Sequence, residues 1–326
     1  MIIGQNNQSS NQRRTVTIIC PVYNEEDCIP LFFERLKVAL APLWEKYVFE
    51  LYFTNNCSTD RTLEIIRLIR AREPWVQVLT LSRNFGYQAS LVGGLCNAAG
   101  DAVIIIDVDC EDPPEIIPQF LAEWEKGNDI VYGERVSRPE HALLRVGRRA
   151  FYRITRRIAD NEFILDMAEF SLISRRVRDV CLFQKSTFPF IRNEIAFAGF
   201  KRIGLPYTRE ARIHGRTHYS LVRMTQFAIA GMLSSSTFPL RFAMYAGVPL
   251  ALVDVIASIA SLFRSTPMDI QWLILANLAL LLMGVGFSAI YIARIYKNGL
   301  NRPLFIVDEE RSLVNRPIVS PMPSAH

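Results

Sequence analysis

The sequence predicts an α/β protein with a doubly wound, mostly parallel sheet, followed by amphipathic helices and two transmembrane helices. Short β-branched runs alternate with helix-forming stretches from residue 15 to residue 132, which is the pattern of repeated β-α-β units. An apolar run at 103–106 ends in clustered carboxylates. Two apolar stretches of roughly 20 to 26 residues follow at 238–263 and 270–295, and each is long enough to cross a bilayer.

The expected strands and helices of the first part alternate regularly. We expect strands at 15–20, 49–54, 76–81, 103–106 and 129–132, and helices at 29–40, 61–72, 88–98 and 115–126. Thr59 or Asp60 would cap the second helix, because short polar side chains accept hydrogen bonds from a helix's first N–H groups. Parallel strands end at the same edge of a sheet, so we expect the polar loops that follow them to converge there.

The carboxylates after the fourth strand predict a metal site. Asp107 and Asp109 are two residues apart, so in extended backbone they point the same way, and Glu111 continues the row if the chain stays extended. Converging carboxylates repel one another, so we expect Mg²⁺ or Mn²⁺ between them, shared with a diphosphate. The alternative is a solvated acidic loop in which Asp112 caps the next helix and Pro113 takes its first position. The two interpretations are compatible.

Composition and charge indicate a membrane-anchored cytoplasmic domain. Half of the 326 residues are hydrophobic and the net charge is +5. The six cysteines lack metal-ligand spacing and suit reduced thiols. No secretory signal is expected in the polar first 14 residues. We divide the chain into a flexible N-terminus (1–14), a cytoplasmic catalytic domain (15–220), an interfacial helix (221–237), a transmembrane hairpin (238–297) and a cytoplasmic tail (298–326).

Cationic residues flank the two apolar stretches and predict their orientation. They are Arg223 and Arg241 before the first stretch, and Arg294, Lys297, Arg302 and Arg311 after the second. This excess places both ends in the cytoplasm. The alternative is a buried helical hairpin in a soluble core. A carboxylate is costly in lipid, so Asp254 should face another helix, another subunit or water.

Residues 141–158 predict a basic amphipathic helix suited to an anionic membrane surface. Its alternative is a helix with a solvated basic face. We expect no nucleic-acid partner, because the chain has no recognisable nucleic-acid-binding motif.

A further group of basic side chains precedes the first apolar stretch. Arginine forks suit phosphate oxygens, and they occur here beside a predicted metal site and a membrane. The group consists of Arg135, Arg209, Arg212, Arg216 and His218. This combination suggests a phosphorylated lipid meeting a nucleotide-activated donor. The alternative is an ordinary basic juxtamembrane stretch.

Several motifs resemble those of family 2 glycosyltransferases that act on polyprenyl phosphates, such as dolichol-phosphate mannose synthases and bacterial undecaprenyl-phosphate glycosyltransferases. They lie at 21–26 (PVYNEE), 56–60 (NCSTD), 81–86 (LSRNFG), 100–115, 131–135 (VYGER), 212–220 (RIHGRTHYS) and 301–305 (NRPLF). The resemblance implies a GT-A fold, and it spans residues 15–307.

The resemblance also implies roles for individual residues. The donor site would comprise Pro21, Tyr23, Glu25, Asn55, Asn56, Arg83, Asp107, Asp109 and Arg135, with Asn55 and Asn56 at the base or ribose. Asp107 and Asp109 would form the D-x-D motif, with Glu111 as a third metal ligand. The acceptor phosphate would contact Arg135, Arg212, Arg216 and His218. Asp166 or Glu169 would orient the acceptor, or form an ion pair with the basic loop.

Four departures from the family's pattern stand out. Asn55 and Asn56 replace two aspartates, Glu111 replaces a glutamine, Glu169 replaces an aspartate and His218 replaces a lysine. The asparagines at 55 and 56 leave open whether the nucleotide is UDP or GDP. His218 would make acceptor binding sensitive to pH.

The expected reaction is an inverting displacement in which a polyprenyl phosphate, with undecaprenyl phosphate as the expected lipid, attacks the anomeric carbon of a nucleotide-sugar. Two alternatives are a processive polysaccharide synthase and a catalytically weakened, membrane-anchored nucleotide-sugar-binding protein. We expect a multi-pass protein of the inner membrane with its catalytic domain on the cytoplasmic side, and self-association through the membrane helices.

Overall fold

The computed structural model describes residues 13–135, 167–183, 187, 189–210, 237–263 and 271–320. The predicted helix at 141–158 lies outside this range, as do residues 221–236 of the predicted interfacial helix. The described elements are β1 (Arg14–Val22), α1 (Ile29–Leu40), η1 (Ala41–Leu43), β2 (Tyr47–Asn55), α2 (Thr62–Arg72), β3 (Val76–Thr80), α3 (Tyr87–Asn97), β4 (Ala102–Ile105), η2 (Pro114–Ile116), α4 (Ile117–Glu125), β5 (Ile130–Arg135), β6 (Met167–Ser174), α6 (Arg175–Phe183), α7 (Ile191–Phe197), β7 (Arg202–Tyr207), α9 (Phe238–Leu262) and α10 (Gln271–Gly299).

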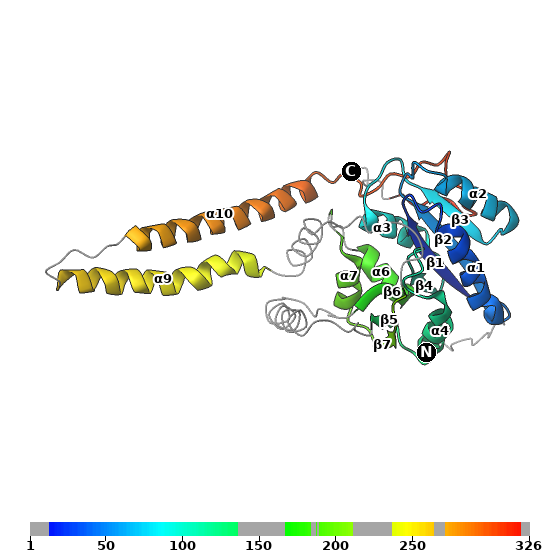
Figure 1. Ribbon diagram of the computed structural model, residues 1–326, viewed down its shortest axis with the longest axis horizontal. Coiled ribbons are helices and arrows are strands. Elements are labelled where there is room, and N and C mark those ends of the chain that lie inside the picture. Colours follow the sequence, from blue (N-terminus) through cyan, green and yellow to red (C-terminus); the bar gives the residue numbers. More distant parts are fainter. Residues whose placement is uncertain are drawn as a thin grey trace, which may run out of the picture.

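The described strands form one sheet in the order β3-β2-β1-β4-β6-β5-β7 (Figure 1). β6 alone among them runs antiparallel to its neighbours, β4 and β5. The pairs β1–β2, β1–β4, β2–β3 and β5–β7 are parallel. The predicted α/β fold with a mostly parallel sheet is therefore confirmed. The elements from β6 to β7 were not predicted.

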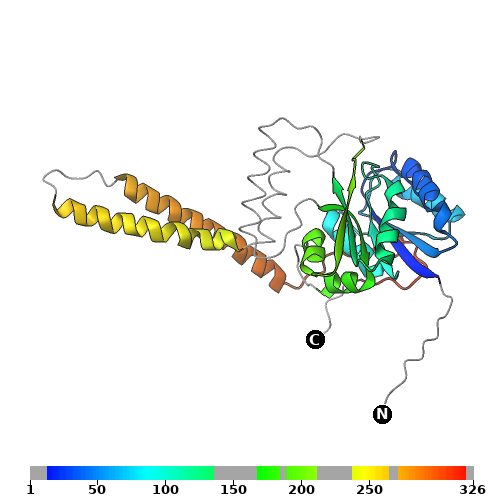
Figure 2. The ribbon, with the colours of Figure 1, turned by 90° about the horizontal axis from the view of Figure 1, so that it is seen from below.

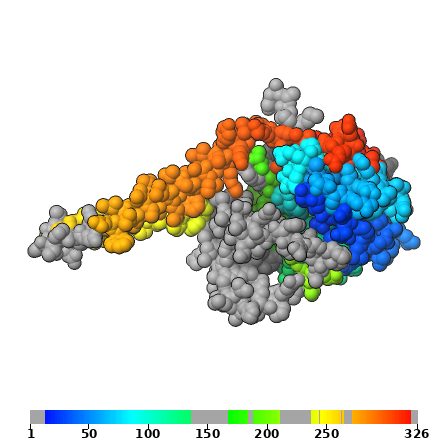
Figure 3. Space-filling view, turned by 45° about the horizontal axis from the view of Figure 1, so that its top comes forward, coloured from blue at the N-terminus to red at the C-terminus, as the bar shows by residue number. Residues whose placement is uncertain are grey.

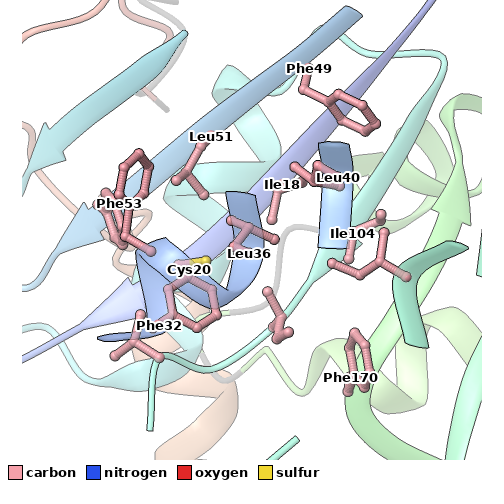
Figure 4. Packing of buried hydrophobic residues seen from close by; sticks show 14 of the residues in the cluster. Ile18, Cys20, Phe32, Leu36, Leu40, Phe49, Leu51, Phe53, Ile104 and Phe170 are labelled. Atoms are coloured by element: carbon pink, nitrogen blue, oxygen red, sulfur yellow. The ribbon is translucent and has the colours of Figure 1, made fainter. Parts of the chain in front are cut away.

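Helices cover both faces of the sheet. On one face α1, α2 and α4 pack on Ile18, Cys20 and Ile104, among other buried side chains (Figure 4). On the other face α3, α6 and α7 pack on a second cluster that includes Ile19 and Ile105. Neighbouring residues in a strand point to opposite faces, so an uninterrupted apolar run such as β4 is buried on both sides. This burial holds the polar strand ends in place.

Two glycines bring α3 close to the sheet. Gly86 begins the helix at φ 93°, a conformation that side chains with a Cβ rarely adopt. A Cβ at Gly94 would lie 2.5 Å from Cγ2 of Ile19 and 3.1 Å from Cγ2 of Thr54. Ser90 also donates a hydrogen bond to the carbonyl of Thr54 at 2.8 Å. α3 is thus held against β1 and β2.

The helices α9 and α10 form a hairpin that projects from the α/β domain (Figures 1 and 2). Within the described residues, Phe238–Ser261 and Gln271–Gly299 are long and apolar enough to cross a membrane. Asp254 accepts a hydrogen bond from the side-chain amide of Asn277 at 2.9 Å. Of the three surroundings expected for Asp254, the structure therefore gives it the other helix of the hairpin.

The chain after α10 returns to the α/β domain and crosses the outer edge of β3. Phe305 is fully buried beside Leu81 and Ala89. Leu313 forms an antiparallel bridge with Val78, and the C-terminal segment, coloured red, lies against the domain in Figure 3. An uncovered edge strand exposes unpaired backbone groups, and this segment pairs them.

Candidate active site

The loops after β1, β2 and β3 are tied together at the carboxyl edge of the sheet. The backbone N–H of Asn24 donates to Oγ of Ser58 at 3.1 Å. In return, the backbone N–H of Thr59 donates to Oδ1 of Asn24 at 2.8 Å. Asn56 donates through Nδ2 to Asn84 at 2.9 Å. Three loops from three strands therefore form one surface, as the parallel sheet predicted.

Asn55 and Asn56, which we expected at the base or ribose, are both buried. Oδ1 of Asn55 accepts from the hydroxyl of Ser58 at 2.6 Å. Oδ1 of Asn56 accepts from the backbone N–H of Phe85 at 2.9 Å. These contacts shape the loop that borders the site. Nδ2 of Asn55 is buried and has no hydrogen-bond partner among the described residues.

The other predicted nucleotide contacts surround this surface. Pro21 is buried at the end of β1, while Tyr23 is 44% exposed. The backbone N–H of Glu25 donates to Oγ1 of Thr62, at the start of α2. The guanidinium of Arg83 lies 3.9 Å from the centre of the Phe85 ring. Tyr23 and Arg83 thus present the accessible side chains for stacking or for phosphate binding.

Asp107 lies at the centre of this edge. Its Oδ1 accepts a hydrogen bond from the hydroxyl of Tyr87, in α3, at 2.8 Å. Burial, together with the neighbouring charge of Asp109, raises the pKa of Asp107 to about 7. The carboxylates near Asp107 therefore repel its charged form, and a bound cation would relieve this repulsion.

The expected row of three carboxylates is not formed. Cys110 has φ 57° and turns the chain, so Glu111 does not continue the line of Asp107 and Asp109. The backbone N–H of Glu111 donates to Oδ1 of Asp109 at 3.1 Å, while its carboxylate pairs with Arg209. No three His, Cys, Asp or Glu side chains in the described ranges form a group that could hold a metal ion.

Asp112 does not cap the next helix. Pro113 is extended, at φ −72° and ψ 124°, and the 3-10 turn η2 begins at Pro114. The carboxylate of Asp112 is buried and accepts from the hydroxyl of Tyr207, with Arg135 at 3.5 Å. Nε of Arg135 also donates to the Tyr207 hydroxyl, at 3.1 Å. A buried carboxylate needs such partners, so this residue is internal. At the second helix, Asp60 does accept from the first N–H, that of Thr62, at 3.0 Å.

Glu169 lies on β6 and pairs with Arg192, at the start of α7, at 3.1 Å. Among the described residues its ion pair is with α7, and the predicted pair with the basic loop involves residues outside the described range. Asp166, Arg212, Arg216 and His218 lie outside the described residues, and their roles stay predictions. Sequence reasoning missed Tyr87, Arg192 and Tyr207, because their partners are distant in the sequence.

Asp107 and Asp109 supply the hard oxygen donors that Mg²⁺ and Mn²⁺ prefer. Two protein carboxylates suit an ion that completes its coordination with water and phosphate oxygens. The repulsion among the carboxylates near Asp107 is consistent with such an ion. The donor set thus fits a divalent cation, for which Asp107 and Asp109 would be the protein ligands.

Comparison with known proteins gives a consistent picture. The model of the family described as glycosyl transferase family 2 matches residues 17–188. An uncharacterized glycosyltransferase of Bacillus subtilis, YkcC, is 34% identical over 92% of this chain and 95% of its own length. The bactoprenol glucosyl transferase of Shigella phage SfV is 31% identical over 91% of this chain and 99% of its own.

Solved structures of lower similarity also match. Glucosyl-3-phosphoglycerate synthase from Mycobacterium tuberculosis, crystallised with Mn²⁺ and UDP, has a TM-score of 0.47 and 22% identity, and the match covers 68% of this chain and 78% of that one. The mannosyltransferase PcManGT from Pyrobaculum calidifontis, in complex with GDP-Man and Mn²⁺, has a TM-score of 0.45 and 19% identity over 88% of each chain.

Proposed function

Because this chain belongs to glycosyl transferase family 2, we propose that it transfers a sugar from a UDP- or GDP-sugar to a polyprenyl phosphate, with inversion at the anomeric carbon. The observation that carries the proposal is the placement of Asp107 and Asp109 at the edge where three loops converge, with Asp107 held by the hydroxyl of Tyr87. Near full-length similarity to bactoprenol glucosyl transferases supports the lipid acceptor.

The acceptor needs little activation. The second pKa of a phosphate monoester is about 6, so most of it is dianionic at neutral pH. A phosphate oxygen can therefore attack the anomeric carbon without a general base from the protein. The tasks left to the protein are positioning the two substrates and stabilising the charge that develops on the departing nucleoside diphosphate.

Residues at the edge of the sheet can perform these tasks. Tyr87 holds Asp107 in orientation through its hydroxyl hydrogen bond. A divalent cation bound by Asp107 and Asp109 would supply positive charge next to the leaving diphosphate. Arg135, which is partly exposed beside Asp112, and Arg212 and Arg216 in the segment after β7 are proposed to bind phosphate oxygens.

The hairpin explains how a water-soluble donor and a lipid acceptor can meet. We assign α9 and α10 to the inner membrane, with the α/β domain on the cytoplasmic side, because cationic side chains flank both helices on the side of that domain. Both ends of the hairpin then lie on the same side of the membrane as the α/β domain, where a water-soluble donor is available.

The test is transfer of labelled sugar from a panel of UDP- and GDP-sugars to undecaprenyl phosphate, by the full chain in detergent. Reactions contain Mg²⁺, Mn²⁺ or EDTA. We expect a monophosphate-linked glycolipid that is lost with EDTA and with Asp109→Ala, but retained with Asp179→Ala, which removes an exposed carboxylate of α6. Nucleotide binding without transfer from any donor would instead support the binding-protein alternative.

A further inference from the structure

The first turns of α3 and α7 meet beside the carboxylate site. The backbone N–H of Ile191 donates to Oε1 of Gln88 at 2.9 Å. Because a backbone N–H can only donate, this contact fixes which end of the Gln88 amide is oxygen. The other end of the amide is therefore the nitrogen, Nε2. That nitrogen is buried and has no hydrogen-bond partner among the residues that the structure describes.

Arg192, the next residue along α7, has a second unpartnered donor. Its Nη2 binds Oε1 of Glu169 at 3.1 Å, while its Nε is buried and lacks a partner in the described part of the chain. A buried N–H without a partner costs free energy, so two such groups, on Gln88 and on the residue that follows its contact Ile191, call for a common explanation. The Arg192 side chain is 23% exposed, so a ligand can reach it.

Charge determines what kind of ligand suits this position. Burial raises the pKa of Tyr87, and the nearby charges of Asp107 and Glu169 raise it further, so these groups lie within electrostatic reach of one another. Glu169 neutralises Arg192, and Asp107 adds a further negative charge. An anionic ligand would be repelled here. A neutral ligand with several hydroxyl groups can both accept from the unpartnered N–H groups and donate to Glu169.

We propose that Gln88, Glu169 and Arg192 form the subsite that recognises the hydroxyl groups of the donor's sugar. This inference rests on the proposed function, since the sugar is the part of a nucleotide-sugar that lies beyond the metal-bound diphosphate. The subsite makes these residues determinants of sugar specificity. It also assigns Glu169 to the donor, whereas the sequence suggested the acceptor.

The experiment compares binding of a nucleoside diphosphate with binding of the corresponding nucleotide-sugar, by titration calorimetry on the full chain in detergent with Mn²⁺. The donor is the one that the transfer panel identifies. The variants are Arg192→Lys, which keeps the charge beside Glu169 but loses the guanidinium fork, and Gln88→Met. Arg176→Lys is the matched control, because Arg176 pairs with Asp129, and Asp129 lies at the opposite end of β5 from Arg135.

We expect both subsite variants to weaken binding of the nucleotide-sugar about tenfold, which corresponds to about 1.4 kcal/mol. Binding of the nucleoside diphosphate should change less than about twofold, and the control should change neither. The ratio of kcat/KM between sugar epimers should fall in the same two variants. Equal weakening of both ligands, no change in either, or a change confined to the KM of the lipid acceptor would overturn the subsite. A wild-type protein that binds no nucleotide-sugar would overturn the proposed function itself.

Discussion

The carboxylates at the two ends of the loop between β4 and α4 differ in whether an arginine neutralises them. At the far end, Asp112 has Arg135 and Tyr207 as partners, and Glu115 makes a two-point contact with Arg35. At the near end, Asp107 is held by the neutral hydroxyl of Tyr87, and no ion pair reaches it from the described residues. The two ends are five residues apart in the sequence, yet one is neutralised and the other is not.

This difference separates carboxylates that hold the fold from carboxylates that are available for a ligand. Arg35 also binds Glu210 at 2.9 Å, and Glu111 pairs with Arg209. These contacts fasten the far end of the loop to the segment that follows β7. A carboxylate whose charge the protein already balances gains little from a cation, whereas Asp107 gains much. We therefore expect three substitutions, in four measurements, to separate the two ends.

The largest effect should come from Asp107→Asn. We expect sugar transfer to fall by about a hundredfold or more, because the variant loses a ligand of the proposed cation next to the leaving group. Steady-state transfer assays at saturating Mn²⁺ measure this effect. Asp179→Asn, on the surface of α6, should keep wild-type activity. Transfer within about threefold of wild type would show that Asp107 is not part of the metal site.

At the opposite end, Tyr207→Phe should mainly affect stability. It removes a hydroxyl that donates to the buried carboxylate of Asp112, and we expect a loss of about 1–3 kcal/mol in unfolding free energy. Thermal melting of the detergent-solubilised chain measures it. Tyr245→Phe is the control, because it removes an exposed hydroxyl from α9. Phe170→Leu would be unsuitable, because it removes a ring from the core. Equal stability of Tyr207→Phe and wild type would refute the structural role.

The pKa of Asp107 predicts an effect of pH on the metal-free protein. Its folded-state pKa of about 7 lies above the ordinary 3.8, so folding favours the protonated form. Stability should therefore be highest, as far as this group is concerned, below about pH 4, and should decrease as pH rises toward 7. At pH 8 in EDTA, Asp107→Asn should be more stable than wild type, by on the order of 1 kcal/mol. Melting curves at pH 5 and pH 8 test this, and an identical pH dependence of the two proteins would contradict it.

The smallest effect is expected for Glu111→Gln. This change breaks the ion pair with Arg209, whose side chain is 37% exposed, so we expect less than about 1 kcal/mol of destabilisation. Transfer should stay within about threefold of wild type, with an unchanged requirement for Mn²⁺. A loss of transfer as large as that of Asp107→Asn would restore Glu111 as a metal ligand.

Local patterns predicted the first half of the fold well. α1 begins and ends where the sequence indicated, at Ile29 and Leu40, because an amphipathic stretch of this length buries one face wherever it packs. The elements from β6 to β7 were missed. β6 carries Glu169 inside an apolar run, and nothing local shows that the strand inserts between β4 and β5, because strand order depends on pairing between distant segments.

Some residues of the candidate site could likewise be predicted from local sequence, and others could not. Asp107 and Asp109 were identifiable because their chemistry follows from two residues at the end of one strand. Asp112 does not cap the helix, because its partners Arg135 and Tyr207 come from later strands. Glu111 pairs with Arg209, about a hundred residues further along the chain, and its role as a metal ligand stays a prediction.

By itself, the sequence determined the family, the alternation of strands and helices, the apolar hairpin and the acidic strand end. Each of these depends on residues within a few positions of one another. The tertiary structure alone decided which carboxylates are neutralised, where Gln88 meets the first turn of α7, and that the C-terminal segment covers β3. These outcomes depend on contacts between distant segments, and a charge or a hydrogen-bond donor acquires its role only from what lies within a few ångströms of it.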